Sequence, residues 1–175
     1  MTTIRHATCA DAAAIARIYN EGIADRVATF ETEPRRVEQI EAQLAERGDR
    51  YPTIVSERDG QVVAWAAASP YSARPCYAGV AEFSVYVART ARGMGIGRAV
   101  LEHLLDECAQ RGFWKLVSRV FPENTASRAL CRSLGFREVG VYQRHARLDG
   151  AWRDCVIVEK LLGEARPKNG DVPGP

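Results

Sequence analysis

The sequence predicts a single α/β (α+β) domain built around a central sheet. Stretches with the two-residue period of strands alternate with stretches of helical period along the 175-residue chain. Two Asp-Gly pairs, Asp59-Gly60 and Asp149-Gly150, separate runs of strand-forming residues and predict tight hairpin turns. The third observation is residues 81–105, where an alternating strand passes through a glycine-rich loop into an amphipathic helix.

The residues before this stretch predict one strand, two helices and a hairpin. Thr8 is a suitable N-cap with an acidic residue three positions later, so a helix follows it and ends near Glu21. A second helix is expected to open at Thr32 and Pro34 and to close at Gly48. The expected strands of this half cover residues 3–7, 53–57 and 61–69, and a loop follows at 70–79.

The strand at the start of residues 81–105 has two distinct faces. Phe83, Val85 and Val87 share one face, and Glu82 lies on the other. The helix after the glycine loop carries an apolar stripe formed by Val100, Leu101, Leu104, Leu105 and Cys108.

The rest of the chain predicts a strand at 113–120, a helix at 124–134 and a final antiparallel pair at 136–142 and 152–161. We expect residues 1–163 to form the one domain. Residues 164–175 are polar and rich in Pro and Gly, so we expect a disordered tail there.

Composition is that of an ordinary globular protein, with 46% hydrophobic and 26% charged residues. The formal net charge is +2 and no run of Lys or Arg accumulates, which argues against a nucleic-acid surface. No apolar stretch approaches the roughly 20 residues needed to span a bilayer, and the N-terminus lacks the apolar core of a signal peptide. We therefore expect a cytoplasmic protein with neither nucleic-acid nor membrane partners.

The five cysteines are odd in number, far apart and without C-x-x-C spacing, and the three histidines form no H-x-x-x-H pair. These spacings predict neither a disulfide framework nor a metal site. The thiols are expected to be reduced, as in a cytosolic protein.

The glycine loop predicts an anion site. Gly93, Gly95 and Gly97 occur at every second position between Arg92 and Arg98. Glycines permit a sharp turn and a close approach of ligand to main chain, and the first turn of the following helix has unpaired N–H groups. Arginines add charge and donors at both edges, so a pyrophosphate-bearing ligand is the natural prediction.

Two familiar phosphate motifs do not match this loop. Counting G-x-G-x-x-G from Gly93 places Arg98 where the third glycine belongs, and no Gly-Lys-Ser/Thr follows. On the residues alone, the glycines could also form nothing more than a tight turn.

Residues 92–97 resemble the R/Q-x-x-G-x-G/A motif of the acetyl-CoA site in the GNAT (Gcn5-related) N-acetyltransferases, and residues 122–136, ending in Leu-Gly-Phe, resemble its second half. The resemblance implies a mixed, strongly twisted sheet flanked by about four helices, with splayed strands holding acetyl-CoA as co-substrate. It implies that the thioester arm pairs with the backbone of Val85 and Val87. The cofactor-binding residues it implies are Val85, Val87, Arg92, Gly93, Gly95, Gly97, Arg98, Asn124 and Ser127.

Glu82 is the candidate catalytic base. A thioester needs a neutral amine, but model amines titrate near ~10.4 for lysine and ~7.7–8.0 for an α-amino group, so a proton must be removed. On its own, a strand glutamate could equally point into solvent. Residues 81–87 resemble the V/A-E-x-S-V-Y-V strand of the phosphinothricin-type acetyltransferases, in which this glutamate is the proposed base.

The subgroup resemblance continues at residues 28–32, 72–77 and 150–154, and residues 142–161 are similar to the arsinothricin-resistance branch. It implies acetylation of the α-amino group of glutamate-like amino acids with a tetrahedral oxyacid or oxidised-sulfur head. Examples are phosphinothricin, methionine sulfone or sulfoximine, and the arsenic analogue arsinothricin. Relatives in this subgroup are commonly homodimers, so we expect a homodimer.

Three residues are candidates for substrate binding. Arg74 could bind an anionic head group through its forked guanidinium, or it could be a solvated loop charge. Phe30 and Tyr77 could form the pocket walls, or they could be ordinary core aromatics. Tyr142 could likewise touch substrate or lie at an interface.

The chain departs from the family at Cys131, where relatives often carry a Tyr or His proposed as the acid that protonates the departing thiolate. A buried cysteine more often only packs. The acid therefore stays unassigned, with His145 as a weaker candidate.

The leading hypothesis is an acetyl-CoA-dependent amino-acid N-acetyltransferase that confers resistance to a toxic glutamate mimic. One alternative is acetylation of another amine, such as a protein N-terminus, a lysine or a polyamine. The other is a non-catalytic acyl-CoA-binding regulator, in which Glu82 has no role.

Overall fold

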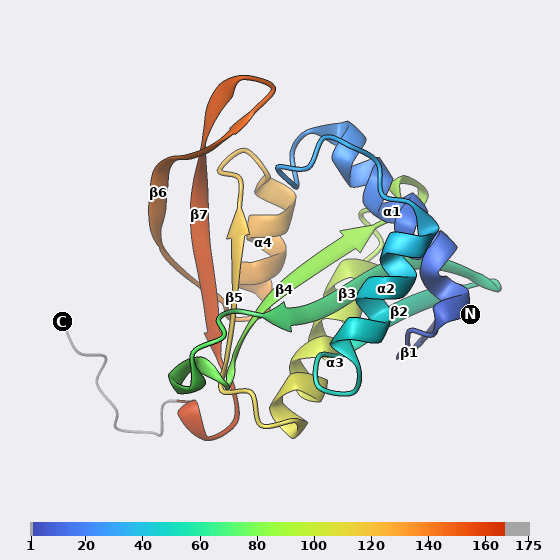
Figure 1. The fold of residues 1–175 in the computed structure, drawn as a ribbon, viewed down its shortest axis with the longest axis horizontal. Helices are drawn as coiled ribbons and strands as arrows, with labels where there is room; N and C mark the ends of the chain where they lie inside the picture. Colours follow the sequence, from blue (N-terminus) through green and yellow to red (C-terminus); the bar gives the residue numbers. More distant parts are fainter. Residues whose placement is uncertain (1, 167–175) are drawn as a thin grey trace.

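A computed structural model of the protein describes residues 2–166, which form a seven-stranded mixed sheet with helices on both faces (Figure 1). The strands are β1 (Thr2–His6), β2 (Thr53–Arg58), β3 (Gln61–Pro70), β4 (Val80–Val87), β5 (Lys115–Val120), β6 (Arg137–Leu148) and β7 (Ala151–Leu161). The helices are α1 (Ala12–Asp25), α2 (Val37–Arg47), α3 (Ile96–Gln110) and α4 (Thr125–Ser133). The predicted mixed α/β fold is confirmed.

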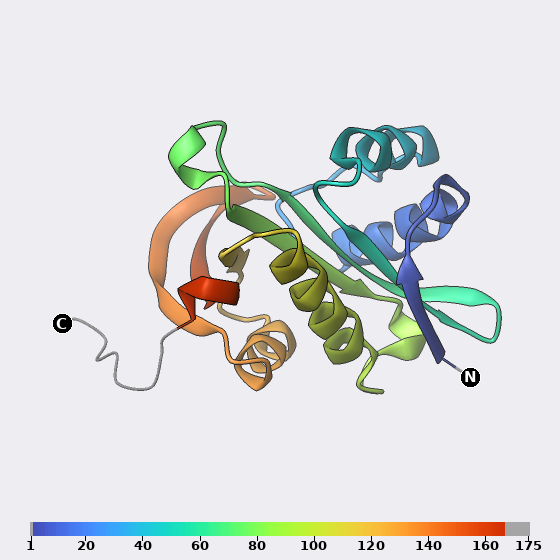
Figure 2. The same ribbon diagram turned by 90° about the horizontal axis from the view of Figure 1, so that it is seen from below.

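The sheet has the strand order β1-β2-β3-β4-β5-β7-β6, and every neighbouring pair is antiparallel except β4–β5. Gly22 of α1 lies against Tyr86 on one face of β4, whereas Gly97 of α3 lies close to Val87 on the other face, with Leu130 of α4 beside Gly97. Helix α2 packs on α1, so α1 and α2 lie on the opposite side of the sheet from α3 (Figure 2).

Strands β4 and β5 separate after a short parallel contact. They pair only from Val80 to Glu82, and at the fork the Ser118 hydroxyl donates a 2.9 Å hydrogen bond to the Phe83 carbonyl. Beyond this point the two strands diverge, with α4 beside them (Figure 1). One backbone edge of β4, as far as Val87, is therefore left without a strand partner, which is the splay that the family resemblance implied.

Helix α1 begins as predicted. Thr8 and Asp11 form a capping box around a short 3-10 turn, Cys9–Asp11, that leads into the helix. The helix extends past Glu21 to Asp25, where Arg26 closes it in the left-handed region with φ 58°.

The prediction that Thr32 and Pro34 open the second helix is wrong. Helix α2 begins at Val37, after Arg36, whose backbone N–H donates to the Gln39 side chain at 2.9 Å. The preceding segment cannot join the helix because Asn20 of α1 holds it: Asn20 accepts from the Arg35 N–H at 2.7 Å and donates to the Arg35 carbonyl at 3.0 Å.

Strand β6 is longer than the predicted 136–142. It continues to Leu148 through an irregularity between Tyr142 and Ala146, where Arg144 has a positive φ of 47°. The Arg144 N–H donates to the Asp154 carboxylate of β7 at 2.7 Å, and this hydrogen bond stabilises the bulge.

The main core lies between the sheet and the helices, and the predicted stripe of α3 belongs to it, with every member at most 5% exposed. A smaller cluster of Phe121, Leu148 and Cys155 lies under Phe30.

Gly163–Ala165 forms a 3-10 turn, so Glu164 is not part of a disordered tail as predicted. The rest of that prediction, residues 167–175, lies outside the described residues. Within residues 2–166, no helix is long and apolar enough to cross a membrane.

Candidate active site

Two cavities meet where β4 and β5 separate. One is a groove of about 440 Å³, the loop groove, which is lined by the glycine loop, Val85, Val87 and the start of α4. The other is a cavity of about 400 Å³, the Glu82 cavity, which lies on the side of α1. A narrow space of about 80 Å³ at the fork is lined by residues of both, including Val85 and Ser84. A ligand entering the groove can therefore reach the Glu82 cavity through the fork.

The glycine loop has the backbone geometry expected of an anion site. Gly93 and Gly95 have positive φ angles of 75° and 77°. Any residue with a Cβ atom would be strained in this conformation, whereas glycine adopts it readily. Gly95 is the N-cap of α3, so the first N–H groups of the helix border the groove. At Gly97 a Cβ atom would lie 3.1 Å from Val87 Cγ2, so glycine lets the helix approach β4 closely. These features fit a diphosphate.

The two loop arginines line the groove but already have protein partners. Arg92 donates through Nε to the Val87 carbonyl at 3.2 Å, and its Nη2 lies 2.8 Å from the Asp25 carboxylate. Arg98 donates to the Ser133 carbonyl at the end of α4, also at 2.8 Å. A bound phosphate would have to share or replace these contacts.

Asn124 and Ser127 lie on the α4 side of the groove, as predicted. Asn124 is the N-cap of α4, because its Oδ1 accepts from the Ser127 N–H at 3.1 Å. Its Nδ2 donates to the Val27 carbonyl at 3.1 Å, which ties the loop after α1 to α4. The structure thus gives Asn124 a structural role, and direct cofactor contact stays a prediction.

Glu82 does not simply point into solvent. Its side chain is 32% exposed, and both carboxylate oxygens lie 2.7 Å from Nη2 of Arg119 on β5. Sequence reasoning missed Arg119. The residue lies two positions after Val117, the parallel partner of Glu82, so both side chains share one face. Only the strand register reveals this, and the sequence does not show it.

The loop at residues 26–36 closes one side of the Glu82 cavity. Phe30 lines the cavity, as predicted, and its ring meets that of Phe121 edge-on at 4.8 Å. Arg26 Nε lies 3.1 Å from the Asp149 carboxylate in the β6–β7 turn, so the loop is also tied to that hairpin.

Two tyrosines form the floor of this cavity. Tyr86 stacks on Trp65 with 4.9 Å between ring centres and meets Tyr19 edge-on at the same distance. Burial raises the pKa of both tyrosines above the ordinary value of 10.0, most strongly for Tyr86. Both phenols therefore stay neutral at physiological pH.

The structure does not bring all of the predicted substrate residues together. Tyr77 and Tyr142 line an adjoining cavity of about 320 Å³ that also borders Glu82. Arg74 lines neither this cavity nor the Glu82 cavity, and its guanidinium lies 5.8 Å from the centre of the Tyr77 ring on an exposed loop. Its role in binding an anionic head stays a prediction.

Cys131 borders the narrow space at the fork but is only 2% exposed. Burial raises the pKa of its thiol to about 11, so it is a weak acid. His145 lines the Glu82 cavity, and its ring lies 4.9 Å from that of Tyr142.

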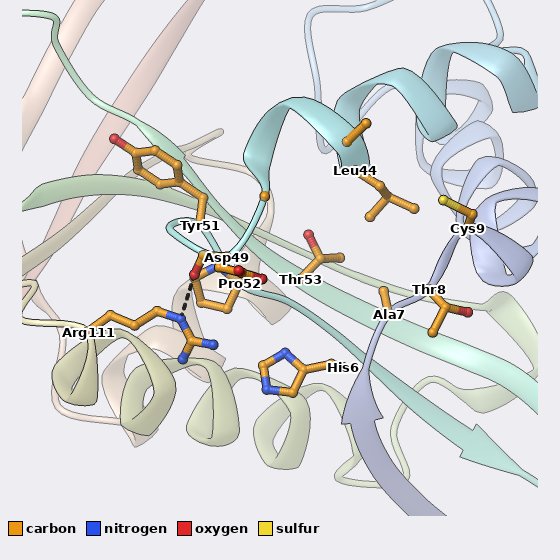
Figure 3. Close-up of a pocket in the computed structure, with 12 residues that line it drawn as sticks. His6, Ala7, Thr8, Cys9, Leu44, Asp49, Tyr51, Pro52, Thr53 and Arg111 are labelled. Atoms are coloured by element: carbon orange, nitrogen blue, oxygen red, sulfur yellow. Dashed lines mark hydrogen bonds between the residues drawn. The ribbon is translucent and has the colours of Figure 1, made fainter.

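A further cavity of about 440 Å³ lies between β1, α2 and the end of α3, and Figure 3 shows its lining. His6 and Arg111, which line it, already have protein partners. His6 Nε2 lies 3.1 Å from Glu107, Arg111 pairs with the same carboxylate, and Arg111 Nε donates to the Asp49 carbonyl at 2.9 Å. The cavity contains none of the predicted site residues.

Comparison with known proteins identifies the class of protein. The chain matches the Acetyltransferase (GNAT) family over residues 15–136, and it belongs to this family. Phosphinothricin N-acetyltransferase from Streptomyces viridochromogenes is 34% identical over 151 residues, which cover 86% of this chain and 82% of that protein. The predicted family is confirmed, and N-acetylation dependent on acetyl-CoA is its reaction.

Two solved structures are similar over almost their whole length. A phosphinothricin acetyltransferase from Sinorhizobium meliloti in complex with AcCoA has a TM-score of 0.88 and 32% identity, covering 98% of this chain and 96% of that one. A ribosomal-protein-alanine N-acetyltransferase from Brucella melitensis has a TM-score of 0.88 and 37% identity, covering 91% and 99%.

Proposed function

We propose that the protein acetylates the α-amino group of a glutamate-like amino acid, such as phosphinothricin, arsinothricin or methionine sulfone or sulfoximine, and so confers resistance to it. The observation that carries the proposal is that the cavity containing Glu82 adjoins the narrow space at the fork, which in turn borders the loop groove. The loop groove has the features of a diphosphate site, and the Glu82 cavity has the size of a small-molecule site.

The residues present fit acetyl-CoA. The amides of Gly93, Gly95 and Gly97 and the first turn of α3 would hold the diphosphate, with Arg92 and Arg98 at its edges. The backbone edge at Val85 and Val87, which has no strand partner, would pair with the thioester arm, and the arm would share the Val87 carbonyl with Arg92 or displace it. Bound acetyl-CoA supplies an acyl carbon that an amine can attack.

Glu82 would act on the amine. An α-ammonium group must lose a proton before its lone pair can attack, and a carboxylate beside it can take that proton. Phe30 and Tyr86 wall the cavity with apolar surface, which would exclude water from the amine. No acid is assigned for the departing thiolate.

The two alternatives are N-acetylation of another kind of amine, such as a protein N-terminus, a lysine or a polyamine, and a non-catalytic regulator. The Brucella relative is named a ribosomal-protein-alanine N-acetyltransferase, and this name favours an amine on a protein as acceptor. A polyamine is less favoured, because Glu82 is the one carboxylate among the residues that line its cavity in the described chain. A non-catalytic regulator would bind acetyl-CoA without turnover.

The test measures CoA release, with product identified by mass spectrometry, over phosphinothricin, arsinothricin, methionine sulfone, methionine sulfoximine, spermidine, a lysine peptide and an N-terminal alanine peptide. We expect N-acetylated product from at least one of the four amino acids, with kcat/KM at least tenfold above the peptides. Preference for a peptide or spermidine would overturn the proposal. Binding of acetyl-CoA without turnover on any amine would favour the regulator.

We also propose that the protein is a homodimer located in the cytoplasm, with residues 1–163 as one domain. Val139, Val141 and Tyr142 of the edge strand β6 are 45–53% exposed, and a second copy could cover them. All five cysteines are free thiols, as expected in a reducing compartment. Sedimentation of the purified protein tests the dimer, and a monomer at micromolar concentration would contradict it.

A further inference from the structure

The ion pair between Glu82 and Arg119 leaves much of the arginine unused. Only Nη2 of Arg119 contacts Glu82, at 2.7 Å from each oxygen. A guanidinium carries five N–H donors. Within residues 2–166, Nε and Nη1 of Arg119 have no protein acceptor within hydrogen-bond distance. An ion pair that is exposed to this extent adds little to the stability of the fold. A contribution to stability therefore does not explain why Arg119 lies beside Glu82.

Arg119 also lies at the centre of the candidate site. It borders the Glu82 cavity, the narrow space at the fork and the adjoining cavity that contains Tyr77. Its side chain is 46% exposed, so a ligand in these cavities can reach it. His145 is the only other group able to carry positive charge among the residues described as lining the Glu82 cavity.

An α-amino acid presents an ammonium and a carboxylate on the same carbon atom. A fixed carboxylate beside a fixed guanidinium offers the opposite charges at a similar spacing. The ammonium would lie on Glu82, and the carboxylate would take the free N–H donors of Arg119, which suit two oxygens at once. A lysine side chain or a peptide N-terminus has no carboxylate at that distance from its amine.

We infer that Arg119 binds the α-carboxylate of the acceptor and so restricts the enzyme to free α-amino acids. The inference rests on the proposed function and names how its substrate is recognised. With the substrate carboxylate on Arg119, Glu82 is free to take the ammonium proton. The same residue therefore selects the substrate and places its amine.

The test crosses enzyme variants with substrate variants. Wild type, Arg119→Gln and Arg119→Lys are assayed with the best amino acid of the panel and with its α-carboxamide. We expect wild type to prefer the acid by about 30-fold or more in kcat/KM, the size expected for hydrogen bonds to a charged group. Arg119→Gln should lose this preference through a higher KM for the acid, with little change for the carboxamide, and Arg119→Lys should regain part of it.

Controls separate recognition from folding. Arg132→Gln removes an exposed arginine that pairs with Glu138 on the outside of α4, and it should keep the wild-type preference. Thermal melting and acetyl-CoA affinity of the Arg119 variants should match wild type. If Arg119→Gln keeps the preference, or slows acid and carboxamide equally, the inference fails while the proposed function stands. If wild type acetylates no amino acid, the proposed function fails and the inference with it.

Discussion

Arg92 of the glycine loop and Asp25 at the end of α1 form an ion pair, with 2.8 Å between Nη2 and Oδ2. The same carboxylate lies 2.6 Å from Nη2 of Arg89. Partial burial acts to raise the pKa of Asp25, but hydrogen bonds from Arg89 and Arg92 outweigh it and hold the pKa below its ordinary value. A fixed negative charge therefore borders the groove that we assign to a diphosphate.

Asp25→Asn should tighten acetyl-CoA binding. The change removes a charge that repels phosphate and frees two arginines, and exposed charge pairs of this kind correspond to a roughly two- to fivefold effect on affinity. The gain should shrink at high salt because the interaction is screened. Isothermal titration at two ionic strengths measures it, with Asp106→Asn on the exposed face of α3 as control. Weaker binding in Asp25→Asn would show that the carboxylate orients the arginines instead.

Glu82→Gln should lower kcat by about 100- to 1,000-fold near neutral pH, the range typical of losing a general base. The affinity for acetyl-CoA should not change, because Glu82 does not line the loop groove. Steady-state kinetics and cofactor titration together check this, with the exposed Glu102→Gln as the matched control. A variant as active as wild type would remove Glu82 as the base.

Much of the fold follows from local sequence signals. The glycine loop, the stripe of α3 and the cap at Thr8 depend on residues close in the chain, and all were predicted. The start of α2 and the length of β6 were not. Both depend on partners that are distant in the sequence. The Asn20 side chain forms hydrogen bonds with the backbone of Arg35, and the Asp154 carboxylate accepts a hydrogen bond from the Arg144 N–H in the bulge.

The candidate site shows the same division. The glycine-loop residues 92–98 are consecutive in the sequence, so their spacing alone indicates an anion site. The contact between Glu82 and Arg119 joins residues 37 positions apart and depends on the parallel register of β4 and β5. Arg74 was chosen for its charge and its resemblance to the family; it does not line the Glu82 cavity, and its role in binding the substrate stays a prediction.

Gly79→Ala should destabilise the protein strongly. A Cβ at this position would lie 1.9 Å from the ring of Trp114. The main chain at Trp114 cannot shift freely to make room, because the backbone N–H groups of Trp114 and Lys115 both donate hydrogen bonds to the Gly79 carbonyl. Overpacking of this kind costs about 2–3 kcal/mol. Urea denaturation measures the loss, and Gly140→Ala, where a Cβ meets nothing within 4 Å, is the control. Equal stability of the two variants would contradict the packing.

Asp11→Asn tests a buried ion pair and its dependence on pH. Both oxygens of Asp11, which is 6% exposed, accept hydrogen bonds of 2.8 Å from Arg5. These bonds hold the pKa of Asp11 below its ordinary 3.8, although burial opposes them. Because the folded pKa is lowered, the stabilisation is present above pH 3.8 and is lost as pH falls through the folded pKa.

We expect Asp11→Asn to lower the free energy of unfolding by about 2 kcal/mol at pH 7, as for a lost hydrogen bond to a charged group. The difference from wild type should shrink as the pH falls below 4. Urea denaturation at pH 7, 5 and 3 measures it. A difference that stays constant over this range would show that the aspartate charge does not contribute.

Cys131→Ala tests whether the buried thiol protonates the departing CoA thiolate. An ordinary thiol has a pKa near ~8.5, and burial raises that of Cys131 to about 11, so proton transfer from Cys131 to a thiolate is unfavourable. We expect kcat and its pH profile to change by less than about twofold, while stability falls by about 1 kcal/mol through the lost packing. Cys108→Ala, at a buried position on α3 away from the site, should behave in the same way. A tenfold loss of kcat in Cys131→Ala alone, with both variants folded, would instead make Cys131 the acid.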